Sequence, residues 1–351
     1  MLSVQKSSTI VFKPSTEKRS TRAYIDTGKF CNYDCEFCYY KDQLDIRDDL
    51  EVVKRRIKKA ADTGMTSIEF CGGESTAEPN WFKFLEYAVE CGFKSISVVT
   101  NGSMFSKPAF LLKSFQMGLT EILFSLHGST PEMHDKIVGR KGAFNRIMYA
   151  IGNANELNIP VRINCTVYDI NHEKLKDEYT ALLKELKPLE VNFIAVKYNL
   201  DNSEFREVKY SDIIESIKAC IDSINDDVKY INVRMVPFCL MQGYEKYNVN
   251  HYQQIYDVYD WNRGTYEENY TAERLSEEEQ TKKDFAAAAR FRIDGYYKAP
   301  SCKDCKNFYI CDGIDNKLKD QELTPIPGKK ILDPNHYRIG FYADVNFNLN
   351  T

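Results

Sequence analysis

The sequence lacks the features of a membrane or secreted protein. None of its apolar runs approaches the roughly 20 residues that a membrane-spanning helix needs. The first residues, MLSVQKSSTIVFKP, do not contain the apolar segment of a secretory signal peptide. We therefore expect a cytoplasmic protein with no membrane partner.

An excess of positive charge is also missing. The chain has 47 Lys and Arg against 51 Asp and Glu, a formal net charge of −4. Its aromatic residues are plentiful but do not alternate with basic runs. Proteins that bind phosphate backbones need clustered positive charge. We expect no nucleic-acid partner, and a nucleic-acid-modifying enzyme is the weaker alternative.

Cysteine, by contrast, is abundant, with 11 residues. In a reducing compartment, clustered cysteines usually bind metal instead of forming disulfides. Four of them lie in apolar or helical segments and are predicted to be small buried side chains: Cys71, Cys91, Cys165 and Cys220. Six others form two clusters: Cys31, Cys35 and Cys38, then Cys302, Cys305 and Cys311.

The first cluster has three thiols in eight residues and no fourth nearby. Thiolates suit iron–sulfur clusters or zinc, and four of them would close a structural site. Three leave one metal position open for chemistry. The CxxxCxxC pattern, with the aromatic Phe37 before its last Cys, resembles the radical SAM superfamily. The resemblance implies a [4Fe–4S] cluster on Cys31, Cys35 and Cys38 whose fourth iron chelates S-adenosylmethionine.

Strands and helices are expected to alternate along the first 200 residues. Such alternation implies parallel strands joined by right-handed crossovers. The expected strands cover 20–27, 67–71, 95–99, 121–125, 161–167 and 191–196. The fold class is α/β, a partial (β/α)6 TIM barrel, which is also the fold of the resembled family. Six units would not close a full barrel.

Glycines and polar residues follow these strands, at the ends where parallel sheets bind ligands. Glycine lets a backbone approach a ligand, a carboxylate accepts from an ammonium group, and Asn or Ser binds carboxylates or ribose hydroxyls. An ordinary turn is the alternative for the glycine pair. The candidate cofactor-binding residues are Gly72, Gly73, Glu74, Asn101, Ser125 and Asn164.

The resemblance also implies individual roles. Gly73 and Glu74 would contact the methionyl amine, Ser125 the ribose or carboxylate, and Phe37 the adenine. Arg146 stands where some members place a carboxylate-binding Arg.

A histidine pair follows the fourth strand. His127 would face the substrate and is the candidate catalytic residue. For His134 and Asp135, a hydrogen bond that orders the loop is at least as good an interpretation.

The second cluster, CxxC followed by five residues and Cys311, resembles the core of the SPASM extension and its shorter twitch relative. These extensions carry auxiliary [4Fe–4S] clusters. Asp315 stands where SPASM proteins have a further Cys, so one auxiliary cluster is expected, with Cys239 as the candidate fourth thiolate. Without Cys239, an open iron would remain for substrate. A structural zinc knuckle on Cys302, Cys305 and Cys311 is the alternative.

These observations divide the chain into five expected segments. They are an extension over 1–19, the radical SAM barrel over 20–200, a connector helix over 201–229, a small α+β twitch/SPASM-like domain over 230–325, and a tail over 326–351.

The resemblance implies an enzyme, and an oxidoreductase is expected. It would cleave S-adenosylmethionine reductively and abstract a hydrogen atom from its substrate, with electrons from a donor such as flavodoxin or ferredoxin. The auxiliary cluster would accept an electron or bind substrate. The short segment before the first strand favours a small molecule, such as a sugar, cyclitol or nucleotide, or a short or stand-alone peptide or protein substrate. A peptide- or protein-modifying maturase is the alternative, and a non-catalytic metal scaffold the rival from another class.

Overall fold

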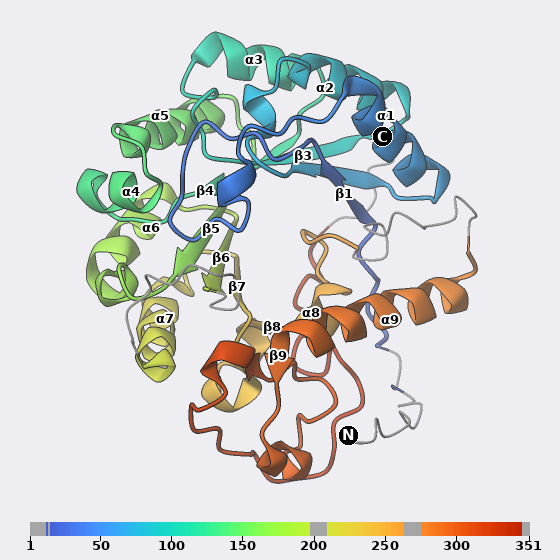
Figure 1. The fold of residues 1–351 in the computed structure, drawn as a ribbon, viewed down its shortest axis with the longest axis vertical. Helices are drawn as coiled ribbons and strands as arrows, with labels where there is room; N and C mark the ends of the chain where they lie inside the picture. The colour runs from blue at the N-terminus through green and yellow to red at the C-terminus, as the bar shows by residue number, and fades with distance from the viewer. Residues whose placement is uncertain (1–11, 13–14, 197–208, 263–274, 346–351) are drawn as a thin grey trace.

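A curled parallel sheet is the main element of the structure, a computed structural model that describes residues 12, 15–196, 209–262 and 275–345 (Figure 1). Eight strands pair in the order in which they occur in the chain, all of them parallel. They are β1 (Arg22–Asp26), β2 (Ser67–Cys71), β3 (Ser95–Thr100), β4 (Glu121–Ser125), β5 (Val161–Val167), β6 (Glu190–Ala195), β7 (Tyr230–Arg234) and β8 (Asn248–Val249). The expected α/β class is confirmed.

Helices follow most of these strands and lie around the outside of the sheet (Figure 1). They are α1 (Leu50–Asp62), α2 (Trp81–Glu90), α3 (Pro108–Gln116), α4 (Pro131–Ile137), α5 (Ala143–Glu156), α6 (Thr180–Leu186) and α7 (Tyr210–Ile224). In the described ranges, no helix has both the length and the apolar character needed to cross a membrane.

Alternation along each strand divides the core from the interior of the barrel. In β2, Ile68 and Phe70 are buried against the helices, while Glu69 between them faces the other way. The same pattern recurs in β4, where Ile122 and Phe124 join the core. Each fully buried apolar side chain of this size contributes about 1.5–3 kcal/mol.

The sheet has two more strands than the six we expected. β7 pairs with β6 along its full length, with Tyr230 opposite Glu190, and β8 extends the sheet beyond it. The sheet therefore continues past residue 200, into the region expected to form the C-terminal domain. A strand of five residues does not reveal its partner in the sequence, because pairing depends on a surface that the rest of the chain builds.

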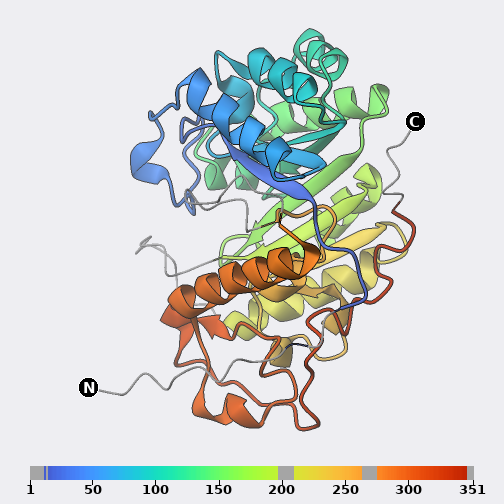
Figure 2. The ribbon, with the colours of Figure 1, turned by 90° about the vertical axis from the view of Figure 1, so that its right-hand side faces the viewer.

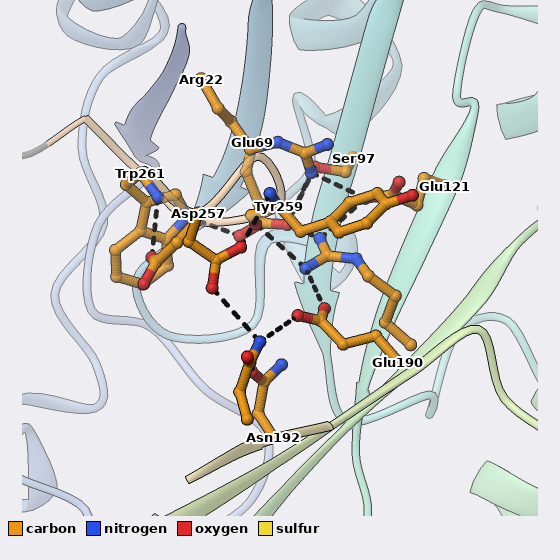
Figure 3. Close-up of polar contacts among 12 residues, drawn as sticks. Arg22, Glu69, Ser97, Glu121, Glu190, Asn192, Asp257, Tyr259 and Trp261 are labelled. Atoms are coloured by element: carbon orange, nitrogen blue, oxygen red, sulfur yellow. Dashed lines mark hydrogen bonds and ion pairs between the residues drawn. The ribbon is translucent and has the colours of Figure 1, made fainter. Parts of the chain in front are cut away.

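A buried layer of charge fills the barrel at the N-terminal ends of its strands (Figure 3). Arg22 lies 2.7 Å from Glu121 and 3.3 Å from Glu69. Arg162 contacts both of these carboxylates as well, and the indole of Trp261 donates to Glu69. Trp261 belongs to a segment far along the chain, so this end of the barrel is closed by residues from the C-terminal half.

Residues after the sheet complete the same layer. Asp257 accepts from Arg234 at 3.1 Å and from the hydroxyl of Tyr342 at 2.6 Å. Arg338 donates to Asn232 at 2.8 Å. The polar groups inside this end of the barrel therefore depend on partners from more than one part of the chain.

The C-terminal region forms the opposite end of the molecule from α1–α3 (Figures 1 and 2). It contains α8 (His251–Gln254), α9 (Glu277–Gly295), and a small antiparallel pair of β9 (Tyr296–Tyr297) with β10 (Ile314–Asp315). A capping box at Ser276 and Glu279 begins α9.

Candidate active site and second cysteine cavity

The loop after β1 brings the first three cysteines together. Backbone hydrogen bonds fix it at both ends, from Lys29 to Ile46 and from Cys31 to Leu44. Three further donors point at its sulfurs. These are Tyr33 N to Cys31 at 3.5 Å, Tyr40 N to Cys38 at 3.4 Å, and Asn101 Nδ2 to Cys31 at 3.9 Å.

The electrostatics of these thiols fit a positively charged cluster. Burial raises the pKa of Cys31 to about 12, and the carboxylate of Glu74 adds to the shift. Burial also raises the pKa of Cys35 far above its usual range, and Cys31 and Cys38 lie close enough to raise it further. Three crowded thiols resist ionisation unless a cation compensates them, and metal binding supplies that compensation.

The glycine pair after β2 lies against this loop. Gly73 donates to the Gly28 carbonyl at 2.9 Å, and Glu74 N donates to the Phe30 carbonyl at 2.7 Å. A Cβ on Gly73 would come within 1.9 Å of the Phe30 oxygen, and one on Gly72 within 2.2 Å of the Gly28 oxygen. The close approach that the sequence predicted is therefore made to the cysteine loop itself.

Glu74 is buried and surrounded by donors from the chain. Its carboxylate accepts from Thr100 Oγ1 and Asn101 N, both at 2.7 Å, and from Thr76. Burial nevertheless raises its pKa. Asn101 directly follows β3, and its side chain donates to Asn32 Oδ1 in the cysteine loop at 2.8 Å. The segments after β2 and β3 are therefore tied to each other and to the cysteine loop.

Ser125 and Asn164 lie side by side on the inner face of the sheet. They are direct partners in the β4–β5 register, and each is half-buried in a strand that is otherwise buried. Both hydroxyl and amide are therefore accessible near the C-terminal ends of the strands, where a polar cofactor would bind.

Phe37, His127 and Tyr168 form an aromatic cluster beside the cysteines. The Phe37 ring makes a T-shaped contact with the His127 ring, with 4.8 Å between the centroids, and another with the Tyr168 ring, with 5.8 Å between the centroids. His127 Nδ1 accepts from Thr166 N at 3.1 Å, and burial lowers the pKa of His127 far below its usual value. His127 is therefore neutral with its proton on Nε2, which suits it to donate a hydrogen bond and not to accept a proton.

His134 and Asp135 order the loop that follows. His134 Nδ1 accepts from His127 N at 3.2 Å, and Asp135 accepts from Phe144 N at 2.9 Å at the start of α5. Arg146 on the same helix lies close enough to Tyr33 to lower the pKa of that phenol, against the larger effect of its burial.

The second cysteine group lines one cavity together with Cys239. Cys239 stands in a 3-10 helix, Phe238–Leu240, just beyond the end of β7. The other three thiols come from the segment after β9, and all four share the cavity wall with Lys298, Phe308 and Gly313. Burial raises the pKa of Cys239 to about 12, and the nearby thiols Cys302, Cys305 and Cys311 add to the shift.

This cavity also offers backbone donors to sulfur. Gly313 N lies 3.4 Å from Cys311 Sγ, and Ile326 N lies 3.4 Å from Cys305 Sγ. Four thiols facing one cavity, with N–H groups aimed at two of them, are a donor set that fits an iron–sulfur cluster.

Within the described ranges, no three Cys, His, Asp or Glu side chains are close enough together to hold a single metal ion.

Sequence reasoning missed two residues that the fold brings to these sites. Tyr168 follows β5 and donates to Glu36 beside Phe37 at 3.1 Å. Lys298 reaches the second cavity, where burial lowers its pKa to about 8. An aromatic directly after an expected strand was a usable signal for Tyr168, whereas nothing in the sequence distinguishes Lys298 from other lysines.

Comparisons with known proteins agree with this geometry. The sequence model of the radical SAM superfamily matches residues 25–182. The antilisterial bacteriocin subtilosin biosynthesis protein AlbA of Bacillus subtilis (strain 168) is 29% identical over 150 residues, 42% of this chain and 33% of AlbA. A probable GTP 3′,8-cyclase of Saccharolobus islandicus (strain M.14.25 / Kamchatka #1) is 28% identical over 169 residues, 46% of this chain and 51% of the cyclase.

Among solved structures, Streptococcus suis SuiB bound to S-adenosylmethionine has a similar fold. Its TM-score is 0.58 at 16% identity, with 90% of this chain and 77% of SuiB covered. The chain spans only a third to a half of the two curated relatives. Together with the cysteine loop and the curled sheet, these matches show that the chain contains a radical SAM domain.

Proposed function

We propose that this enzyme cleaves S-adenosylmethionine reductively and abstracts a hydrogen atom from its substrate, assisted by a second iron–sulfur cluster. The observation that carries the proposal is the pair of cysteine groups, each gathered by the fold. When bound, a [4Fe–4S] cluster and S-adenosylmethionine would supply the 5′-deoxyadenosyl radical that removes the hydrogen atom. A one-electron donor such as flavodoxin or ferredoxin would provide the electron.

The residues of the first site would hold and orient these groups. Cys31, Cys35 and Cys38 would bind three irons and leave the fourth open. The accessible Ser125 and Asn164 would hold the polar parts of S-adenosylmethionine, from the inner face of the sheet.

Other residues of that site would act from its edges. Phe37 would pack against the adenine, and His127 would donate a hydrogen bond from Nε2 to the cofactor or the substrate. Four of the candidate residues would act chiefly by fixing the cysteine loop, because their contacts are made with that loop and with each other. They are Gly72, Gly73, Glu74 and Asn101.

The second cavity would hold the auxiliary [4Fe–4S] cluster on Cys239, Cys302, Cys305 and Cys311. Cys239 follows β7 and the first cluster loop follows β1, so both lie beyond the C-terminal edge of one parallel sheet. A cluster there would stand on the side where the substrate enters. We accordingly propose that the cluster-bearing region is a twitch-like unit within residues 230–325, and that the net reaction is an oxidation.

Two substrate classes remain as proposals. A small molecule such as a sugar, cyclitol or nucleotide is the first, and the name of the GTP cyclase relative favours it. Peptide modification is the second, favoured by the names of AlbA, a bacteriocin biosynthesis protein, and of SuiB, whose structure has been solved with a precursor peptide.

Iron analysis and product formation test the proposal. Anaerobically prepared protein should contain about eight irons per chain, four for each cluster. With a strong reductant and S-adenosylmethionine it should form 5′-deoxyadenosine, and Cys35→Ala should abolish this product. Cys91→Ala, at a half-buried cysteine outside both sites, is the matched control and should retain it. Zinc in place of iron would support the scaffold alternative and refute the enzyme.

A further inference from the structure

Lys298 stands on the wall of the four-cysteine cavity, directly after β9. The residue is half-buried. Its ammonium donates to the carbonyl of Phe308 and lies 4.5 Å from the centre of the Phe308 ring. Its chain also fills the space beside Gly313, where a Cβ would come within 3.0 Å of Lys298 Cγ. The positive charge is thus held in place at the cavity.

This charge forms no ion pair with a carboxylate in the part of the chain that the structure describes, although Asp312 lies near enough to favour the charged ammonium. The adjacent Asp312 carboxylate instead accepts from His251, at 2.9 Å from its backbone nitrogen and 2.7 Å from Nδ1. Desolvating an ammonium without an anion is costly. The thiols that share the cavity, once they are ionised, are the further groups that can offset this cost, and Cys311 has the largest effect.

We propose that Lys298 is the charge-compensating residue of the second cluster and raises its reduction potential. This inference rests on the auxiliary cluster proposed above. One added electron makes a thiolate-bound cluster more negative by one charge, so a fixed ammonium stabilises the reduced form more than the oxidised form. In the proposed reaction, the electron would come from the substrate radical, which is thereby oxidised. Lys298 would make the cluster a better acceptor.

A redox titration of the second cluster tests this role. The full-length chain carrying Ala at Cys31, Cys35 and Cys38 should retain only that cluster. In this background, Lys298→Met should lower the equilibrium constant for one-electron reduction about tenfold. The equivalent shift is about 59 mV to more negative potential, measured by electron paramagnetic resonance. Lys298→Arg should stay near the parent, and so should Lys303→Met, which removes an exposed charge beside Cys302.

The outcomes separate the two proposals. If Lys298→Met binds four irons at an unchanged potential, the role of Lys298 is refuted while the auxiliary cluster stands. If Lys298→Met loses iron, the variants Lys298→Gln and Lys298→Arg are compared. Loss of iron in Lys298→Gln with retention of iron in Lys298→Arg supports the need for the positive charge. Any other pattern overturns the role of Lys298. If the parent itself binds no iron, the auxiliary cluster is refuted, and this inference with it.

Discussion

Two buried histidines show how burial sets the chemistry of single residues here. His127 and His134 are both nearly inaccessible, and each uses Nδ1 to accept a backbone N–H. Protonation would break these hydrogen bonds and bury a charge, so both rings stay neutral at physiological pH. His127 is therefore suited to orient a ligand, and its position beside Phe37 would place that contact at the cofactor.

The pH dependence of stability should report on His134. Burial lowers its pKa to about 4 in the folded protein, against about 6.5 when unfolded. Between these values the unfolded state binds more protons, so the free energy of unfolding falls as pH decreases. Lowering the pH from 7 to 5 should therefore reduce the free energy of unfolding by about 2 kcal/mol through His134. His134→Asn keeps an acceptor for His127 N and should remove this part of the loss. Equal losses in urea denaturation of both proteins would contradict the assignment.

At the scale of elements, the turn after β2 holds the loop after β1. The two segments share backbone hydrogen bonds at Gly28 and Phe30, and the glycines leave no room for a Cβ. The cysteine loop is therefore shaped by its neighbouring strand as much as by its own sequence.

Gly73→Ala should disturb the loop and with it the first cluster. The new Cβ would lie 1.9 Å from the Phe30 carbonyl oxygen, which forces the backbone apart. We expect a loss of about 3 kcal/mol in stability and of iron at the first site. Gly152→Ala is the control, since a Cβ at that exposed helical position meets nothing within 4 Å. It should stabilise the protein by up to about 1 kcal/mol. Unchanged iron content in Gly73→Ala would show that the close contact between Gly73 and the Phe30 carbonyl is not needed for the first cluster.

At the scale of the whole molecule, the charged layer joins the two halves of the chain. Arg22 and Arg162 come from the barrel, while Asp257, Trp261 and Tyr342 come from the later segments that close it. A buried charge that loses one partner is strongly destabilising. The barrel is therefore not expected to be stable without the C-terminal residues.

Tyr342→Phe tests this coupling with the loss of one oxygen. The hydroxyl donates to Asp257 at 2.6 Å, and the Tyr342 side chain is buried. Its removal leaves a buried carboxylate short of a donor and should lower the free energy of unfolding by about 1–3 kcal/mol. Tyr149→Phe, at a side chain that is 70% exposed, should change it by less than about 0.5 kcal/mol. Similar denaturation midpoints for the two variants would argue against a shared layer.

Local patterns in the sequence were enough for the elements and for the cysteine loop. The expected strand over 161–167 coincides with β5, and that over 121–125 coincides with β4. Hydrophobic periodicity and turn glycines are local signals, because a few neighbouring residues decide which face of an element is apolar. The CxxxCxxC spacing is equally local.

Only the tertiary structure decided which distant residues meet. It added β7 and β8 to the sheet, brought Lys298 to the cavity of the four cysteines, and closed the barrel with Trp261 and Tyr342. Each of these contacts joins segments that no local pattern relates. They form because strand register and burial fix where the chain passes, and a charge or thiol then finds the partner that lies there.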